Sequence, residues 1–218
     1  MVTYFKNKGE NMKIVSYILA LITFCLFGIM LVSFEKPSFV KFDNAMSDAL
    51  LGNDLIIAFH YLGETTAIIV VALILLVVVW LKQRNYRGML FILLTIGMGR
   101  VWNQLLKNWV DRPRPEIASH INSFSFPSGH AMLALLYLLT IAYLLTETLA
   151  SQKKAIIIWV AAIFISIMAG VSRIAESHHF ATDVIAGWCI GYTWFIICVI
   201  WYEQRKRKLN KLTDNTLH

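Results

Sequence analysis

Cysteine is scarce in this 218-residue sequence, and it has no cluster of metal-binding side chains. The three cysteines lie inside apolar runs and form neither a C-x-x-C pair nor another spacing typical of a zinc site; they are Cys25, Cys189 and Cys198. No group of carboxylates has the spacing that binds a divalent cation. We therefore expect no disulfide framework, no metal and no other cofactor.

Internal repeats, low-complexity tracts and long linkers are also missing. Nothing in the sequence divides it, so we expect one domain over residues 1–218. Acidic residues are outnumbered by basic ones, 13 to 20, which leaves a net charge of +7. Basic proteins often bind nucleic acid, but here Lys and Arg stand in short blocks between long apolar runs, as in membrane proteins. We expect no nucleic-acid partner.

Apolar residues make up 58% of the sequence, and its mean hydropathy is +0.62. Ordinary soluble domains contain about 45–50% apolar residues, so the expected solvent of this chain is the lipid bilayer. Six apolar stretches are long enough to cross a membrane as helices. They cover residues 14–34, 66–81, 88–106, 129–145, 155–171 and 180–202.

Residues 39–51, between the first two stretches, carry apolar side chains at mixed spacing together with Lys41, Asp43 and Asp48. This pattern is typical of a short amphipathic helix at the membrane surface. We therefore predict an all-α protein, a six-transmembrane-helix bundle with a short extracytoplasmic interfacial helix between the first two spans. The first stretch is too long for a signal peptide and lacks a small-residue cleavage site, so we expect it to be retained.

Basic residues in the short loops assign the two sides of the membrane. Most of them fall on one side, which we predict to be cytoplasmic and to hold both termini of a multi-pass cell-membrane protein. They are Lys6, Lys8, Lys13, Lys82, Arg84, Arg87, Lys153, Lys154, Arg205, Lys206, Arg207, Lys208 and Lys211. Besides Lys36 and Lys41, the outer side keeps a group that topology does not explain. Its members are Arg100, Lys107, Arg112, Arg114 and Arg173.

Three polar segments fall at membrane ends on this outer side: residues 107–115, 127–130 and 172–183. The helix before the first segment presents a polar face at helical spacing, made of Arg100, Asn103, Gln104 and Lys107. Charged groups in or near a membrane span are costly and usually mark a site. The alternative is that the first three of these side chains satisfy one another between packed helices.

The second and third segments provide a helix start and two histidines. Ser128 stands immediately before an apolar span and is a natural N-cap, so the free N–H groups beside it can bind an anion such as phosphate. In the third segment, Asp183 follows His179 at i+4. If the last helix has begun by His179, the carboxylate can accept a hydrogen bond from the imidazole Nδ1–H.

Together these residues supply what phosphoryl transfer needs. Fixed cations and a helix N-terminus neutralise the oxygens of a transferring phosphoryl group. A neutral imidazole oriented by a carboxylate is a competent nucleophile, and a second histidine can protonate the departing alkoxide. The sequence thus predicts a phosphoryl-transfer site whose motif core covers residues 107–183.

The patterns Lys-x6-Arg-Pro, Pro-Ser-Gly-His and Ser-Arg-x5-His-x3-Asp, in this order, resemble the motifs of the type-2 phosphatidic acid phosphatase family. The six-helix layout is also that of the family's membrane-bound lipid phosphatases. The resemblance implies that His179 forms a phosphohistidine, that Asp183 orients it, and that His130 acts as acid and then as base. It also implies a set of phosphate-binding residues, Lys107, Arg114, Ser128, Gly129 and Arg173.

The resemblance predicts an integral-membrane phosphatase with its active site on the extracytoplasmic face. The substrates it implies are membrane lipid phosphates: polyprenyl pyrophosphate, phosphatidylglycerol phosphate or phosphatidic acid. The sequence departs from many relatives at Ala175 and Ser177, where they have Tyr and Gly, and it adds Glu176 and His178, which leaves the substrate open. Two other functions stay open, a lipid phosphotransferase with the same site and a transporter or scaffold that only binds an anion; the oligomeric state is also open.

Four polar residues outside this pattern have plainer explanations. His60 and His120 are lone histidines in outer segments, and we expect both to be surface residues. Asp111 and Arg112 are expected either to pair locally or to meet a lipid headgroup.

Overall fold

The computed structural model describes residues 2–83, 85–118, 122–149 and 151–216, with the backbone alone for 2–12, 82–83 and 209–216. Arg84 and His120, which the sequence places on the cytoplasmic side and on the surface, lie outside the described residues. So do the side chains of Lys6, Lys8, Lys82 and Lys211. Within these bounds all regular structure is helical, which confirms the all-α prediction.

The long helices are α1 (Val2–Ser33), α4 (Thr65–Gln83), α6 (Gly99–Val110), α7 (Gly129–Glu147), α8 (Gln152–Ala175) and α9 (Ala181–Thr216). The shorter elements are α2 (Pro37–Leu50), α3 (Asp54–Ile57), α5 (Tyr86–Ile92), the 3-10 turns η1 (Ala58–Gly63) and η3 (Glu116–Ala118), and the π-helical η2 (Leu93–Met98). Helices α5, η2 and α6 follow one another directly and form one apolar stretch over Tyr86–Val110. This stretch contains the predicted span 88–106, but its π-helical part was not predicted.

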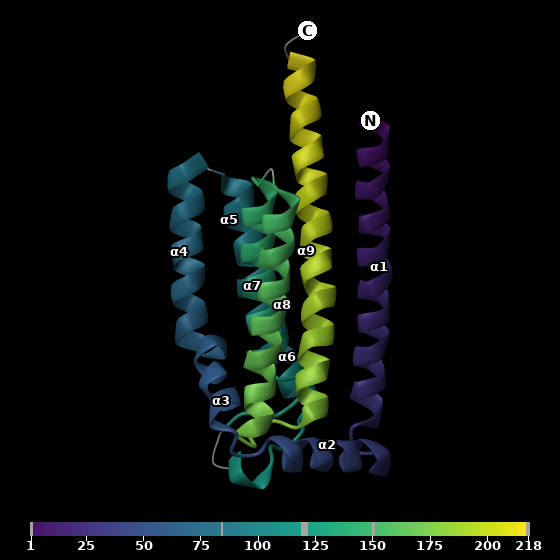
Figure 1. Ribbon diagram of the computed structural model, residues 1–218, viewed down its shortest axis with the longest axis vertical. Coiled ribbons are helices and arrows are strands. Elements are labelled where there is room, and N and C mark those ends of the chain that lie inside the picture. Colours follow the sequence, from purple (N-terminus) through teal and green to yellow (C-terminus); the bar gives the residue numbers. More distant parts are fainter. Residues whose placement is uncertain (1, 84, 119–121, 150, 217–218) are drawn as a thin grey trace.

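The long helices run side by side, with α7 packed against α4, α6, α8 and α9 (Figure 1). The buried side chains of Met132 and Leu136 on α7 form the core together with Phe91 and Tyr202. Helix α1 begins and α9 ends at the same end of the bundle (Figure 1). The opposite end holds α2, which lies across the other helices, and the loops that join α6 to α7 and α8 to α9. These two loops carry most of the predicted polar segments.

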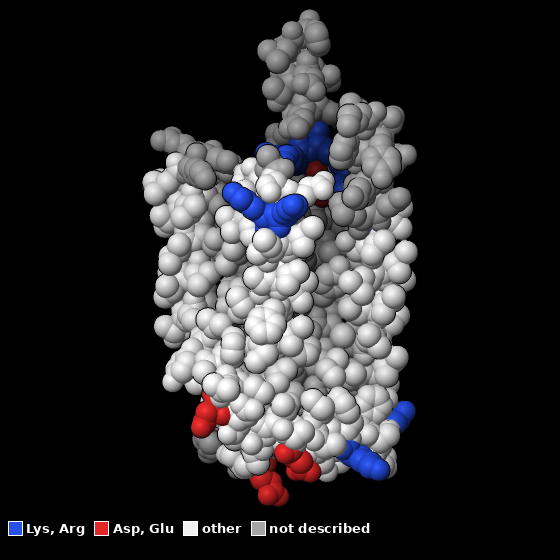
Figure 2. All heavy atoms as spheres, viewed as in Figure 1, with Lys and Arg blue, Asp and Glu red and all other residues white. Residues whose placement is uncertain are grey.

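The outside of the bundle is apolar along most of its length. Large hydrophobic side chains such as Leu73, Val160 and Phe164 are more than half exposed. On the face drawn in Figure 2, charged residues gather toward the two ends and leave a broad uncharged band between them. In the described part of the chain, five helices are long and apolar enough to cross a membrane. The pair Asp54–Gly63 and Thr65–Leu81, bent by 49°, passes the same test together. The chain is therefore a multi-pass membrane protein.

Gly187 allows α9 to approach the start of α7 closely. A Cβ atom at this position would lie 2.6 Å from the carbonyl oxygen of Ser128, a backbone atom that cannot rotate away. We predict that Gly187→Ala lowers the free energy of unfolding by about 1–3 kcal/mol, as overpacking does, although alanine is the better helix former. Thermal unfolding in detergent checks this.

The matched control is Gly28→Ala on α1, where nothing lies within 4 Å of the added Cβ. It should leave the melting temperature unchanged or slightly raised. A melting temperature of Gly187→Ala at or above that of the wild type would contradict the close approach.

Candidate active site

The three polar segments meet at one end of the bundle. His179 is only 3% exposed, and its Nε2 lies 3.4 Å from Nη1 of Arg114. Its Nδ1 lies 3.4 Å from Oγ of Ser125. The backbone N–H of Ser128 donates to the carbonyl oxygen of Asp183 at 3.0 Å. Residues far apart in the sequence thus share one small volume.

The first segment is held by the C-terminal end of α6. Lys107 is buried in the last turn, and its ammonium donates to the carbonyl oxygen of Phe124. Asp111 takes a left-handed conformation, with φ at 59°, which ends the helix and turns the chain toward the site. Arg114 then donates to the carbonyl oxygens of Ser123, at 2.7 Å, and His178, at 2.9 Å. The second of these bonds ties the first segment to the third.

The second segment begins α7 as the sequence predicts. Ser128 is the N-cap: its backbone is extended, and its hydroxyl accepts from the N–H of Ala131 at 3.4 Å. The next residue has no room for a side chain, because a Cβ at Gly129 would lie 2.9 Å from Oδ1 of Asn103. Asn103 in turn donates to the carbonyl oxygen of Pro127 at 3.2 Å. These contacts lock α6 and the start of α7 together.

In the third segment the helix begins after His179, and not at or before it. Because α9 starts at Ala181, His179 lies in the loop before the helix and not on its first turn. Asp183 is the third helical residue and accepts from the N–H of Phe180 at 2.9 Å, the backward bond of a capping box. Its Oδ2 also accepts from the Ser125 hydroxyl and lies 3.5 Å from Nδ1 of His179. The carboxylate therefore faces the imidazole across a loop.

Arg112 has neither of the partners considered for it from the sequence. Its guanidinium is buried and pairs with two carboxylates, Asp183 at 2.6 Å and Asp43 of α2 at 3.0 Å. Asp43 also accepts from the N–H and from the hydroxyl of Thr182, each at 2.8 Å. This network fastens α2 to the start of α9. Local sequence patterns could not reveal it, because the partners of Arg112 lie 69 and 71 residues away along the chain.

A second polar group lies beside the site. His60, which the sequence places at the surface, is partly exposed, and its Nδ1 lies 3.0 Å from Oε1 of Glu176. The other oxygen of Glu176 accepts from Arg173 at 2.5 Å. Glu64, at the bend between η1 and α4, has its Oε1 3.4 Å from Nε2 of His130. No motif signals His60 or Glu64, since both lie far before the first polar segment.

The polar face of α6 does not satisfy itself, so that alternative is wrong. Asn103 bonds to Pro127, and Gln104 donates to Asn108 at 3.1 Å. Arg100 is exposed and lines a cavity between the helices. The three side chains therefore serve different neighbours.

The site is strongly cationic. Burial lowers the pKa of His179 well below its ordinary range, and the charges of Lys107, Arg114 and Arg173 lower it further, so the imidazole is neutral. Burial, followed by the charge of Arg173, also lowers the pKa of Arg114, which remains a cation. The Nε of Arg173 is buried and has no hydrogen-bond partner in the described part of the chain. Such donors suit an anion with several oxygens, such as phosphate.

A metal centre is not apparent at the site. Among the residues that the structure describes, no group of three or more His, Cys, Asp and Glu side chains is arranged to hold a metal ion.

Removing the charge of Arg112 would leave the carboxylates of Asp43 and Asp183 buried without a cation. We predict that Arg112→Gln lowers the free energy of unfolding by about 3–5 kcal/mol. The matched control is Arg207→Gln, which removes an exposed partner of Glu203 and should cost at most about 1 kcal/mol. The measurement is the free energy of unfolding of both variants in detergent. Similar losses would show that the buried network stabilises the protein no more than the exposed ion pair does.

Comparisons with known proteins agree with this geometry. Residues 85–207 match the family model described as the PAP2 superfamily. The chain is 30% identical over 194 residues to phosphatidylglycerophosphatase B of Bacillus subtilis (strain 168), an alignment that covers 84% of this chain and 95% of the relative. It also superposes with a TM-score of 0.77 and 29% identity on the crystal structure of a transmembrane PAP2 type phosphatidylglycerolphosphate phosphatase from Bacillus subtilis, covering 85% and 96% of the two chains. The chain therefore belongs to the PAP2 superfamily.

Proposed function

We propose that this chain hydrolyses a lipid phosphomonoester or pyrophosphate through a phosphohistidine on His179. Membership of the PAP2 superfamily and the likeness to a phosphatidylglycerophosphatase B make the chain a membrane lipid phosphatase. The observation that carries the mechanism is the buried His179 imidazole, with Asp183 near one nitrogen and Arg114 near the other. The candidate substrates are polyprenyl pyrophosphate, phosphatidylglycerol phosphate and phosphatidic acid.

The proposed reaction begins when Nε2 of His179 attacks phosphorus. Its Nδ1–H points to the carboxylate of Asp183, which keeps the lone pair on Nε2. The bond between phosphorus and the lipid oxygen breaks, and His130 gives its proton to that oxygen. His130 then takes a proton from water, which displaces His179 and releases phosphate. The charge on the phosphoryl oxygens is neutralised by Lys107, Arg114, Arg173 and the helix start at Ser128 and Gly129.

We assign the nucleophile to His179 and not to its neighbour. Nδ1 of His178 lies 2.6 Å from Nη2 of Arg173 and 3.4 Å from Oε2 of Glu176. The ring of His178 therefore faces that ion pair, whereas the ring of His179 faces Asp183 and the cations of the site.

We propose six spans in a single domain. Because α1 begins and α9 ends at the same end of the bundle, the number of crossings is even, and the bent pair adds the sixth to the five long apolar helices. The basic residues near these two ends favour the cytoplasm for both termini. The site then lies on the extracytoplasmic face, with α2 in the membrane interface.

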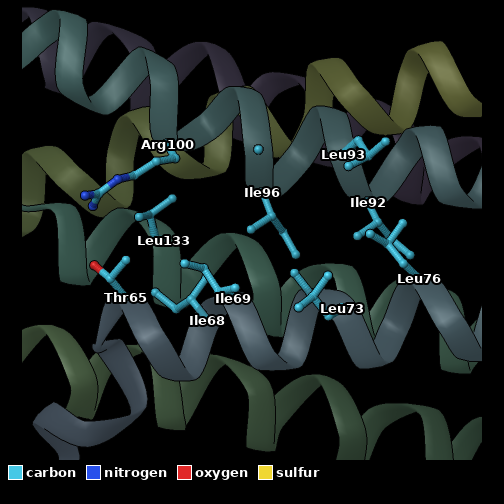
Figure 3. Close-up of a pocket in the computed structure, with 12 residues that line it drawn as sticks. Thr65, Ile68, Ile69, Leu73, Leu76, Ile92, Leu93, Ile96, Arg100 and Leu133 are labelled. Carbon is cyan, nitrogen blue, oxygen red and sulfur yellow. The ribbon is translucent and has the colours of Figure 1, made fainter.

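An apolar cavity of about 300 Å³ between α4 and the stretch from α5 to α7 supports entry of a lipid tail from the side (Figure 3). Its lining includes Ile68, Leu73, Ile92 and Ile96. Ile69 and Leu93, also in the lining, are about half exposed, so the cavity opens on the outside of the bundle. A volume of this size is typical of the lower range of ligand sites.

We predict that His179→Ala and His130→Ala each reduce phosphate release by several orders of magnitude, because one removes the nucleophile and the other the acid and base. His178→Ala should lose far less, since the ring of His178 contacts Arg173 and Glu176. The assay measures inorganic phosphate released from the candidate lipids in detergent with EDTA and no other acceptor. Full activity of His179→Ala would remove this residue from the mechanism, and a need for an added alcohol would favour phosphotransfer.

The pH profile provides a further prediction. His179 must be neutral to attack, and its pKa is held below the ordinary imidazole value of about 6.5, so protonation sets in only below that value. The acid limb of kcat/KM should therefore lie below pH 6.5. An acid limb above pH 7 would contradict a nucleophile held neutral by its burial and by the neighbouring cations.

A further inference from the structure

Arg100 is a cation in the middle of an apolar stretch. It is exposed and forms no hydrogen bond or ion pair with any residue that the structure describes. Val110 ends the helix about 15 Å further along at 1.5 Å per residue, so Arg100 starts well inside a span. A charge at such depth is costly and is retained where a partner compensates it. The partner has to come from outside the described chain.

The surroundings of Arg100 indicate the chemical nature of the rest of the ligand. Arg100 lines the apolar cavity, and its guanidinium extends toward the end where Thr65 and Leu133 lie (Figure 3). Along α4 the cavity runs from Thr65 to Leu76, about 16 Å in helical rise. The ligand that fits is therefore anionic at one end and apolar over a length that suits a lipid chain.

The polar end of the cavity adjoins the leaving-group side of the proposed reaction. Thr65 follows Glu64, whose carboxylate lies 3.4 Å from Nε2 of His130, and Leu133 follows His130 on α7. On α6, Arg100 stands two turns before Lys107, about 10 Å along the axis. An anion at Arg100 would thus sit between the reacting phosphorus and the lipid tail.

We infer that Arg100 binds a second phosphate of the lipid, the one that stays on the product. This inference rests on the proposed function and narrows its substrate class to lipids with two phosphate groups ahead of the tail. The two groups can be joined directly, as in a prenyl pyrophosphate, or separated by glycerol, as in phosphatidylglycerol phosphate. Only the outer bond between phosphorus and the leaving oxygen breaks, and that oxygen takes the proton of His130. Phosphatidic acid has no second phosphate and leaves Arg100 unpaired.

Two pairs of substrates with matched tails test this. One pair is dioleoyl phosphatidylglycerol phosphate and dioleoyl phosphatidic acid; the other is farnesyl pyrophosphate and farnesyl monophosphate. We expect Arg100→Gln to lower kcat/KM about 10- to 100-fold for a member with two phosphates, the effect of losing a charge-assisted hydrogen bond. The members with one phosphate should change less than about threefold. Arg100→Lys should restore part of the loss.

The matched control is Arg87→Gln, the same change at the other end of the same apolar stretch. For each substrate pair, this control should leave the ratio of the two kcat/KM values unchanged. The activity of Arg100→Gln on monophosphates reports that the variant is folded and that its catalytic residues work. A loss confined to one pair identifies whether the two phosphates are joined directly or through glycerol.

Equal losses on one-phosphate and two-phosphate substrates, or no loss on any, would overturn the role of Arg100. Either result would leave it as a side chain that contacts bulk lipid headgroups. Failure of the proposed function gives a different result: the wild-type protein would then release phosphate from none of the four substrates.

Discussion

The buried carboxylate of Asp183 is the group on which the site depends. It caps the start of α9 through the N–H of Phe180, pairs with Arg112, and accepts from the hydroxyl of Ser125. It also faces Nδ1 of His179 at 3.5 Å. A buried carboxylate is tolerated only when its partners are complete, and these partners come from separate parts of the chain. The interaction that closes this end of the bundle is thus the one we propose to orient the nucleophile.

The charge balance of the site follows from this arrangement. Arg112 pairs with the two buried carboxylates, Asp43 and Asp183. Lys107 and Arg114 donate mainly to backbone carbonyl oxygens. Among the residues that the structure describes, Arg173 is the one site cation with a carboxylate bonded to it. Burial, and after it the positive charge of these residues, keeps the imidazole of His179 neutral. The same cations leave hydrogen-bond donors for an anion. The phosphohistidine mechanism that we propose needs both properties in one place.

Much of the fold and of the candidate site could be predicted from local patterns. The apolar stretches gave the helices because each is long enough to cross a bilayer, and Ser128 was recognisable as a cap from its place before such a stretch. The motif residues came together because their segments lie at the same membrane end. Their catalytic roles remain predictions.

The parts that could not be predicted depend on contacts across the fold. The pairing of Arg112 with Asp43 joins residues 69 apart, and the approach of Glu64 to His130 depends on a bend before α4. The start of α9 at Ala181 follows from the capping bond of Asp183 and not from the apolar run. Neither the hydrophobic periodicity nor the charge pattern of the sequence shows which distant residues come into contact.

The most direct measurement is an experimental structure of the protein with vanadate, an oxyanion that can take the trigonal-bipyramidal geometry of a phosphoryl group during in-line attack. We expect vanadium within bonding distance of Nε2 of His179, with its oxygens bound by Lys107, Arg114 and Arg173. Vanadium bound to His178, or an oxyanion held away from the three cations, would contradict it.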